Sequence, residues 1–285
     1  MLRWRNRTER RLSRVAAWGA RLLLTAAVCM ATAIGVEGAD RTITADPPLI
    51  VESHPVGRYG GQVRYAGLSD PRTLNPLLSR ESSSTDVLAW LFDGLVEIDP
   101  QTGEVTPGLA HSWEFSDDGL EWTFHLRKGV YWHDGVEFTA DDVIFTFDLI
   151  YDPSIPTTSR DVFTIAGKYL EYEKVDRYTV RFRLPEPFAP LLRSMVGAIL
   201  PRHRLYDAWR EGRFNETWGV NTPVQEIIGT GPLRAVSYLP GERVVYEVNR
   251  HYWRVDQEGN PLPYVDGLLR FIVENQDTQS LMFDS

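Results

Sequence analysis

The side chains best suited to acid–base or metal chemistry are six histidines and two neighbouring aspartates. The histidines are scattered at spacings that suit no mononuclear zinc motif. His133 precedes Asp134 and Gly135, a run that is more simply explained as a turn than as a catalytic group. Asp141 and Asp142 are poorly placed as an acid–base pair, because neighbouring helix positions point about 100° apart. The histidines are His54, His111, His125, His133, His203 and His251.

Motifs of the common enzyme classes are missing from the sequence. There is no Gly-x-Ser-x-Gly elbow, no His-Glu-x-x-His zinc motif and no Gly-x-x-x-x-Gly-Lys phosphate loop. Gly229 and Gly231 are spaced like the first two glycines of a dinucleotide-binding loop, but the third is absent. We therefore predict a protein without catalytic activity, cofactor or metal, with an exported hydrolase as the lesser alternative.

The first 39 residues differ in kind from the rest of the chain. Several arginines precede a mostly apolar stretch, residues 22–34, that ends in small residues, which is the order of a secretory signal peptide. The apolar stretch is shorter than the roughly 20 residues that a membrane span needs. We take Ala39 as the working boundary and predict an exported, soluble mature protein. The arginines are Arg3, Arg5, Arg7, Arg10, Arg11 and Arg14.

Two other features of this segment leave the export route open. Cys29, the only cysteine, could carry a lipid, but Val28 is unfavourable before such a cysteine and the usual leucine three positions ahead is missing. Arg10 and Arg11 could form a twin-arginine signal, although the expected Phe-Leu pair does not follow. If Cys29 leaves with the signal, the mature chain has no thiol, which suits any compartment.

The composition is that of a water-soluble protein with room for one or two domains. The 285 residues are 43% hydrophobic and 12% aromatic, and the mean hydropathy is -0.27. Without residues 1–39 the chain keeps 23 basic and 37 acidic residues, a net charge of -14. Such an acidic exported protein is not expected to bind nucleic acid or an anionic membrane.

Hydrophobic periodicity predicts strands and helices without a steady repeat, which favours an α/β class with mixed sheets. The clearest strand is residues 121–127, where Trp122, Phe124 and Leu126 alternate with polar residues. Thr139 is the expected N-cap of a helix whose first turn holds the two aspartates. Further predictions are an extended lead-in at 40–57, strands at 62–66, 95–98, 113–115 and 179–184, and helices at 85–92 and 143–150.

In their order, these segments resemble one family, the large extracytoplasmic solute-binding proteins (family 5) of oligopeptide and dipeptide ABC importers. The resemblance covers residues 58–285, and several motifs in one order are more specific than any single motif. The motifs are Gly60-Gly61, Leu74-Asn75-Pro76, Thr106-Pro107-Gly108-Leu109-Ala110, Ser112-Trp113-Glu114, Asp118-Gly119-Leu120, Trp122-Thr123-Phe124, Leu126-Arg127, Gly129-Val130, Trp132-His133-Asp134-Gly135, Phe138 to Val143, Gly229-Thr230-Gly231-Pro232, Asn249, Tyr252-Trp253 and Pro263-Tyr264-Val265-Asp266.

The resemblance implies a mixed-sheet clamshell of the type II periplasmic binding protein kind. Residues 58–92 and 199–285 are expected to form the first lobe, and residues 93–198 a subdomain inserted into it. The sequence stops where the second lobe should begin, so that lobe, with the acidic residue that holds a peptide amine, is expected to be absent. Residues 1–285 alone are therefore expected to bind peptide only weakly. The implied partners are a peptide or other small solute and the permease subunits of an ABC importer, and a monomer is expected.

The resemblance also suggests ligand-binding residues in three segments, each with a structural alternative. Arg80, Glu81, Ser82 and Ser83 match a loop that faces the cleft, although the run could be a solvated turn. Phe145 matches an aromatic position at the ligand in oligopeptide binders, but core packing would explain it equally well. Thr230 and Gly231 either touch ligand or only shape the turn that re-enters the first lobe. Large aromatic rings such as Trp113 and Trp132 are expected on hairpin strands, with their side chains in the core.

The solute itself is not determined by these residues. Members of the family also serve nickel, haem and oligosaccharide uptake, and their specificity lies largely in the second lobe. A receptor that feeds a sensor or a folding role would have the same lobes, so it stands as the alternative to an importer component.

Overall fold

The computed structural model describes residues 41–51 and 56–275. All of them belong to one compact unit, Glu37–Ser285. The predicted signal peptide, its cleavage site and Cys29 lie outside the described residues, so what was predicted for them stays a prediction.

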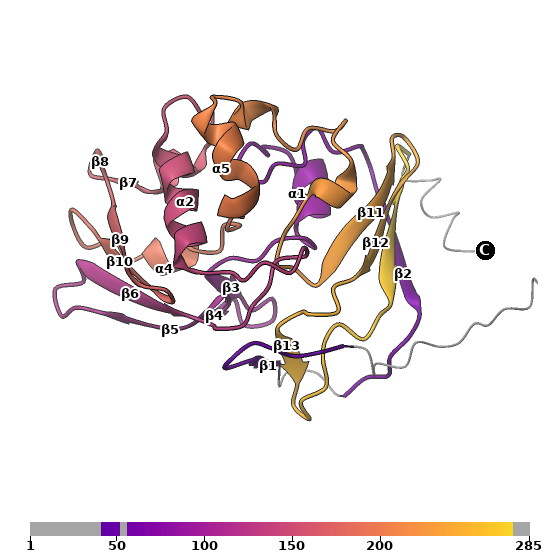
Figure 1. Ribbon diagram of the computed structural model, residues 1–285, viewed down its shortest axis with the longest axis horizontal. Coiled ribbons are helices and arrows are strands. Elements are labelled where there is room, and N and C mark those ends of the chain that lie inside the picture. Colours follow the sequence, from indigo (N-terminus) through magenta and orange to yellow (C-terminus); the bar gives the residue numbers. More distant parts are fainter. Residues whose placement is uncertain (1–40, 52–55, 276–285) are drawn as a thin grey trace, which may run out of the picture. The chain divides into compact units, whose positions relative to one another are not determined.

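The first of two four-stranded sheets combines strands from both ends of the described chain (Figure 1). Its first three strands are antiparallel, and the last strand pairs in parallel. Tyr246 is buried on the inner face, where its hydroxyl donates to the carbonyl of Val87 in helix α1 (Ser82–Leu88) at 3.4 Å. The strand order is β11 (Leu233–Leu239), β12 (Arg243–Val248), β14 (Gly267–Ile272) and β2 (Gln62–Gly67).

The second four-stranded sheet is antiparallel and comes from the middle of the chain. Helix α2 (Ala140–Tyr151) covers its inner face (Figure 1), and Phe147 packs on Phe182 with ring centroids 4.8 Å apart. Phe124 meets Phe182 edge to face at 5.7 Å. These rings form the core between helix and sheet. The strand order is β5 (Ala110–Phe115), β6 (Glu121–Leu126), β10 (Thr179–Arg183) and β9 (Glu171–Asp176).

The remaining elements are short, apart from helix α5. The strand pairs are β1 (Leu49–Val51) with β13 (Arg254–Asp256), β3 (Val96–Ile98) with β4 (Val105–Pro107), and β7 (Thr164–Ile165) with β8 (Lys168–Tyr169). The helices are α3 (Ser159–Val162), α4 (Leu191–Ser194), α5 (Arg202–Arg210) and the 3-10 turns η2 (Phe214–Glu216) and η3 (Val224–Glu226).

The start of α2 confirms the predicted N-cap. The Thr139 side chain and the carboxylate of Asp142 form a capping box, and Asp142 accepts the backbone N–H of Thr139 at 2.9 Å. The other carboxylate oxygen of Asp142 accepts the N–H of Arg202 at 2.9 Å. Burial raises the pKa of Asp142, and these hydrogen bonds oppose the rise. Asp142 is therefore a structural cap, as the sequence suggested.

Two local predictions were wrong. Helix α1 begins at Ser82, three residues before the predicted start, so Ser82 and Ser83 belong to a helical turn and not to a loop. The backbone N–H of Thr85 donates to the carbonyl of Glu81 at 3.2 Å, which closes the first helical turn around these serines. Trp132 was expected on a strand but lies outside the named strands, close to an isolated bridge between Tyr131 and Glu137. Its ring is still in the core.

The ends of the predicted insert lie side by side. The N–H of Ile199 donates to the carbonyl of Asp93 at 3.1 Å, and all strands of the second sheet lie between these two residues. The first sheet uses only residues outside that range. This arrangement supports the division into a lobe and an insert, which stays a proposal.

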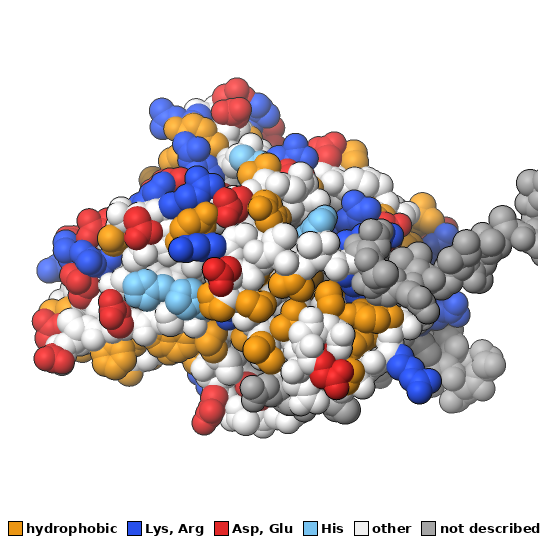
Figure 2. All heavy atoms as spheres, turned by 60° about the horizontal axis from the view of Figure 1, so that its bottom comes forward, with side chains coloured by type: hydrophobic (Ala, Val, Ile, Leu, Met, Phe, Trp, Pro, Cys, Tyr) orange, Lys and Arg blue, Asp and Glu red, His pale blue; other side chains and the backbone are white. Residues whose placement is uncertain are grey.

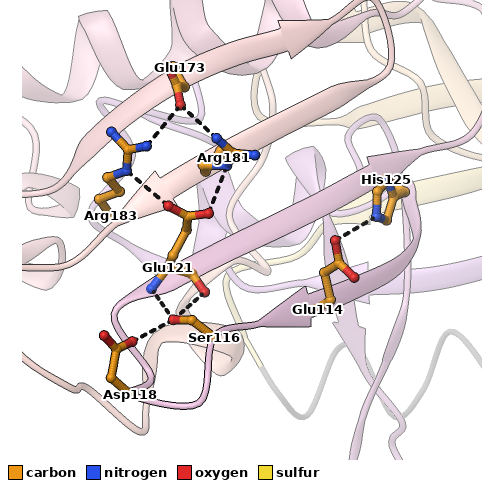
Figure 3. Close-up of polar contacts among 8 residues, drawn as sticks. All are labelled: Glu114, Ser116, Asp118, Glu121, His125, Glu173, Arg181 and Arg183. Atoms are coloured by element: carbon orange, nitrogen blue, oxygen red, sulfur yellow. Dashed lines mark hydrogen bonds and ion pairs between the residues drawn. The ribbon is translucent and has the colours of Figure 1, made fainter.

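The outer face of the second sheet carries a ladder of ion pairs (Figure 3). Glu121 pairs with Arg181 at 3.1 Å and with Arg183 at 3.0 Å, and Glu173 accepts from both arginines. Figure 2 shows side chains of both charge signs mixed over this end of the molecule. The four charges of this ladder are therefore paired with one another across neighbouring strands.

Candidate functional site

A cleft of about 610 Å³ lies beside helix α1 and is lined by residues next to all three predicted ligand-binding segments. Ser79 and Thr85 flank the segment 80–83, Thr146 follows Phe145, and Pro232 follows Gly231. The lining is mostly apolar, with a few hydroxyl groups and charged side chains, as in most small-molecule sites. The structure therefore brings the predicted segments together at one hollow.

Arg80 and Glu81 lie at the N-terminus of α1, and both already have partners. The guanidinium of exposed Arg80 donates to the carbonyl of Pro156 at 2.5 Å, which links the start of α1 to the chain after α2. Glu81 accepts the Ser84 hydroxyl and the backbone N–H of Arg80. The Ser84 hydrogen bond holds the pKa of Glu81 below its ordinary value. Neither residue lines the cleft directly.

Ser82 and Ser83 face different surroundings, because successive residues of a helix point in different directions. Ser82 is exposed and Ser83 is buried. The cleft is lined instead by Thr85, one helical turn after Ser82. The ligand contacts predicted for the segment 80–83 stay predictions.

Phe145 is buried in the core. Its side chain is 1% exposed, and its ring packs against Tyr206 and Trp209 with centroids 6.2 and 5.8 Å away. The next residues of α2, Thr146 and Phe147, line the cleft. The position of Phe145 agrees with the interpretation that it packs in the core. Ligand contact by its ring stays a prediction.

Thr230 and Gly231 are packed tightly against the end of the α1 segment. Thr230 is 1% exposed, and the N–H of Gly231 donates to the carbonyl of Leu91 at 2.9 Å. A Cβ atom on Gly231 would lie 2.6 Å from the carbonyl oxygen of Trp90, so only glycine fits without a backbone shift. These contacts support the turn-shaping alternative, while ligand contact stays a prediction.

The carboxylate of Asp93 holds this turn in place. It accepts the Thr230 hydroxyl at 2.9 Å, the Trp253 indole N–H at 3.1 Å and the Tyr252 hydroxyl at 3.3 Å. The guanidinium of Arg254 lies 3.7 Å away. Asp93 side-chain exposure is only 4%, so the carboxylate depends on these donors for its solvation. We call these five residues the Asp93 network.

Arg254 connects the Asp93 network to the cleft. Its guanidinium pairs closely with Glu97 of β3 and lies over the rings of Trp253 and Tyr252, at 4.8 and 5.4 Å from their centroids. Burial lowers the pKa of Arg254, and the charge of Asp93 opposes this effect. Asp93, Glu97 and Arg254 all line the cleft.

The His133 ring makes two hydrogen bonds to the backbone of the same turn, residues 229–231. Its Nδ1 accepts the N–H of Gly229 at 3.2 Å, and its Nε2 donates to the carbonyl of Gly231 at 3.1 Å. This pattern requires the neutral ring. Burial lowers the pKa of His133 to about 4, so the ring stays neutral at pH 7.

Within residues 41–51 and 56–275, no group of three or more His, Cys, Asp or Glu side chains is placed to hold a metal ion. Over the same residues, no helix has the length and apolar character to cross a membrane.

The family model for bacterial extracellular solute-binding proteins, family 5, matches residues 104–285. This is more than half of the chain. The chain belongs to this family. The observed mixed sheets and the solved relatives below also confirm the predicted fold class.

One curated relative and two solved structures match most of this chain but less than half of their own length. The dipeptide-binding protein of Escherichia coli is 36% identical over 207 residues, which cover 66% of this chain and 38% of the relative. The periplasmic binding protein DppA of Helicobacter pylori, solved with the peptide STSA, matches with a TM-score of 0.66 and 29% identity over 80% of this chain and 45% of that one. MelB of Agrobacterium fabrum, solved with stachyose, matches with a TM-score of 0.70 and 26% identity over 82% and 38%. The chain thus spans about two fifths of the length of the curated relative.

The sequence analysis missed Asp93, Glu97 and Arg254. A signal for Asp93 was present, because it is a charged residue inside the otherwise apolar run from Leu91 to Val96. A charge in such a run is expected to be buried and to need donors from elsewhere. Nothing local identifies those donors.

Proposed function

We propose that this protein is the substrate-binding component of an ABC importer and that it holds a peptide, or a solute of similar size, between two lobes. The observation that carries this proposal is the cleft, at which residues adjoining all three predicted segments meet. Its volume of about 610 Å³ is within the roughly 300–1,000 Å³ range of small-molecule sites. Membership of the family and the peptide in the DppA relative support the same function.

The proposal includes export, a monomeric state and delivery to permease subunits. The family is described as extracellular, and its relatives are named as binding proteins, which supports a function without catalysis. Ligand release to a permease requires that binding be reversible, so closure of two lobes is the motion we expect. No nucleic acid partner is proposed.

A titration tests the function directly. The mature protein, expressed from its own gene, is titrated by calorimetry with a library of di- and tripeptides, and its products are analysed after long incubation. We expect saturable binding of some peptides, with every peptide recovered intact. Hydrolysis that one point change in the protein abolishes would contradict the proposal, and so would an absence of binding to all peptides and peptide-sized solutes.

A further inference from the structure

Among the described residues, five aromatic side chains line the cleft, and one of them differs from the rest. Phe92, Phe147, Phe163 and Tyr252 are only 2% to 8% exposed. Each of them packs against another ring of the protein, with centroids 5.0 to 5.7 Å apart. Trp90 is 38% exposed and has no such ring partner within residues 41–51 and 56–275. Of the five, Trp90 is therefore the one that a solute can cover.

The exposed part of Trp90 is its side chain. The backbone packs against the turn of residues 229–231 and the strand that follows it. The Trp90 carbonyl accepts the N–H of Leu233 at 3.1 Å, and a Cβ atom on Gly231 would lie 2.6 Å from the same carbonyl oxygen. Because the backbone is covered in this way, the exposed area belongs mainly to the indole.

The indole is also fixed at its polar end. Its Nε1 donates to the hydroxyl of Tyr65 at 3.3 Å. Tyr65 lies on β2, within the first sheet, so a regular element of the fold holds the N–H end of the ring. A ring that is already held in place loses little conformational freedom when a ligand covers it, which favours binding.

The surroundings of Trp90 suit an apolar group. Ala89 precedes it and also lines the cleft, as does Pro232, which precedes the residue that binds the Trp90 carbonyl. Neither of these side chains has a hydrogen-bonding group. A sugar would need polar partners for its hydroxyls, because buried polar groups without partners are costly. An aromatic side chain needs only apolar area and gains further from stacked or edge-to-face contact with the indole.

We propose that Trp90 forms a subsite for an aromatic side chain of the bound solute, which makes Trp90 a specificity-determining residue. This inference rests on the proposed function. It names the class of solute, a peptide that contains phenylalanine, tyrosine or tryptophan. In the complex, the solute ring and the indole remove each other's apolar surface from water.

The test compares Trp90→Leu with Phe115→Leu in the mature protein expressed from its own gene. Phe115 is a matched control, because its ring is 61% exposed but lies on β5 of the second sheet and does not line the cleft. The probes are tripeptides of alanine with one phenylalanine or one leucine, placed at each position in turn, and the saccharide stachyose. Calorimetry gives the dissociation constants.

We expect the wild-type protein to bind its best phenylalanine tripeptide about fivefold more tightly than the corresponding leucine tripeptide, because leucine is apolar but has no ring. Trp90→Leu should bring the two affinities together, while Phe115→Leu should keep the preference. Equal affinity of the wild-type protein for both tripeptides would overturn the subsite but leave the proposed function intact. Binding of stachyose and of no tripeptide would do the same. An absence of binding to every tripeptide and every other small solute would instead count against the proposed function itself.

A structural role of Trp90 is distinguished by a second variant and by stability. Trp90→Phe keeps a ring but loses the N–H that binds Tyr65, so it should retain a preference for phenylalanine, smaller than that of the wild-type protein. Urea denaturation of Trp90→Leu should give a midpoint close to that of the wild-type protein, because the indole is exposed. A uniform loss of affinity in Trp90→Leu, with the preference for phenylalanine unchanged, would show that Trp90 only shapes the cleft.

Discussion

Ion pairs occur in two contrasting regions of this molecule. Beside the cleft, Arg254 pairs with Glu97 and Asp93, and the three side chains are 4% to 26% exposed. On the outer face of the second sheet, Arg181 and Arg183 pair with Glu121 and Glu173 (Figure 3), and these side chains are 30% to 51% exposed. The chemical groups are the same, but the surroundings differ.

The difference shows why only one region is a candidate for recognition. Exposed pairs gain little because water and salt screen them. Each of the four charges in the ladder also has partners of opposite sign within it. The buried pairs have lost their hydration, so their charges depend on a few fixed donors and on each other. Removal of one partner should therefore matter much more beside the cleft than on the sheet.

Loss of the Asp93 carboxylate should have the largest effect. Asp93→Ala leaves the hydroxyls of Thr230 and Tyr252 and the indole of Trp253 without their acceptor, and it leaves Arg254 with one carboxylate fewer. We expect a loss of about 3–5 kcal/mol in the free energy of unfolding, measured by urea denaturation. Asp118→Ala, at an exposed carboxylate that accepts the Ser116 hydroxyl at 2.6 Å, should leave the midpoint nearly unchanged. Similar midpoints for both variants would remove the contrast between the two regions.

An added side chain at Gly229, in the turn of residues 229–231, should have the next largest effect on the free energy of unfolding. A Cβ atom on Gly229 would lie 1.7 Å from the carbonyl oxygen of Leu91, so Gly229→Ala forces the backbone of the turn to move. We expect it to cost about 3 kcal/mol of unfolding free energy, the upper end of the usual range for overpacking. Gly219→Ala is the control, because the corresponding Cβ atom meets nothing within 4 Å. A stable Gly229→Ala protein would show that the turn is less tightly fixed than its contacts imply.

The contrast between the regions also explains what the sequence could predict. The strand at residues 121–127 and the cap at Thr139 were correct, because both depend on neighbours in the chain. The Asp93 network was not predictable in this way, since Thr230 and Trp253 lie 137 and 160 residues further along. Only the folded chain brings those donors to Asp93.

For the candidate site, the sequence predicted three segments, and the side chains that line the cleft are neighbours of the predicted ones. Ligand contact by either set stays a prediction. In α1 the helix starts at Ser82 and not at Thr85, which changes which residues of the run face the cleft. Phe145 packs in the core, and its neighbour Thr146, which is also buried, is the residue that lines the cleft. Which side chains of a helix face the cleft depends on tertiary packing, and a sequence motif does not specify it.

Acid should weaken the turn through His133, with a smaller effect than either substitution. The pKa of His133 is about 4 in the folded protein and 6.5 ordinarily, so between these values the unfolded chain binds more protons. Stability attributable to the neutral ring is present above pH 6.5, falls as the pH drops toward 4, and falls no further below it. Between pH 7 and pH 5 the loss should be about 2 kcal/mol.

Urea denaturation at both pH values checks this effect. His133→Gln keeps a hydrogen-bonding side chain but does not titrate, so its change in stability between pH 7 and pH 5 should be smaller than that of the wild-type protein by the same amount. Between pH 7 and pH 8 the wild-type protein should show almost no contribution from His133. Parallel pH profiles for the two proteins would mean that the ring is not held in its neutral form by Gly229 and Gly231.

The smallest effect is expected on the ion-pair ladder of the second sheet. Arg181 contacts Glu121 at 3.1 Å and Glu173 at 3.2 Å, but all three side chains are in contact with solvent. Arg181→Ala should therefore cost about 0.2–1 kcal/mol, and the difference from the wild-type protein should shrink when the salt concentration rises, because the lost interaction is screened. Arg181→Met separates charge from packing, since it keeps most of the aliphatic stem and should recover the part of the loss that salt does not remove. A loss above about 2 kcal/mol that is insensitive to salt would place the ladder in the same class as the Asp93 network. The burial of a charged pair would then not be what distinguishes the cleft from the sheet.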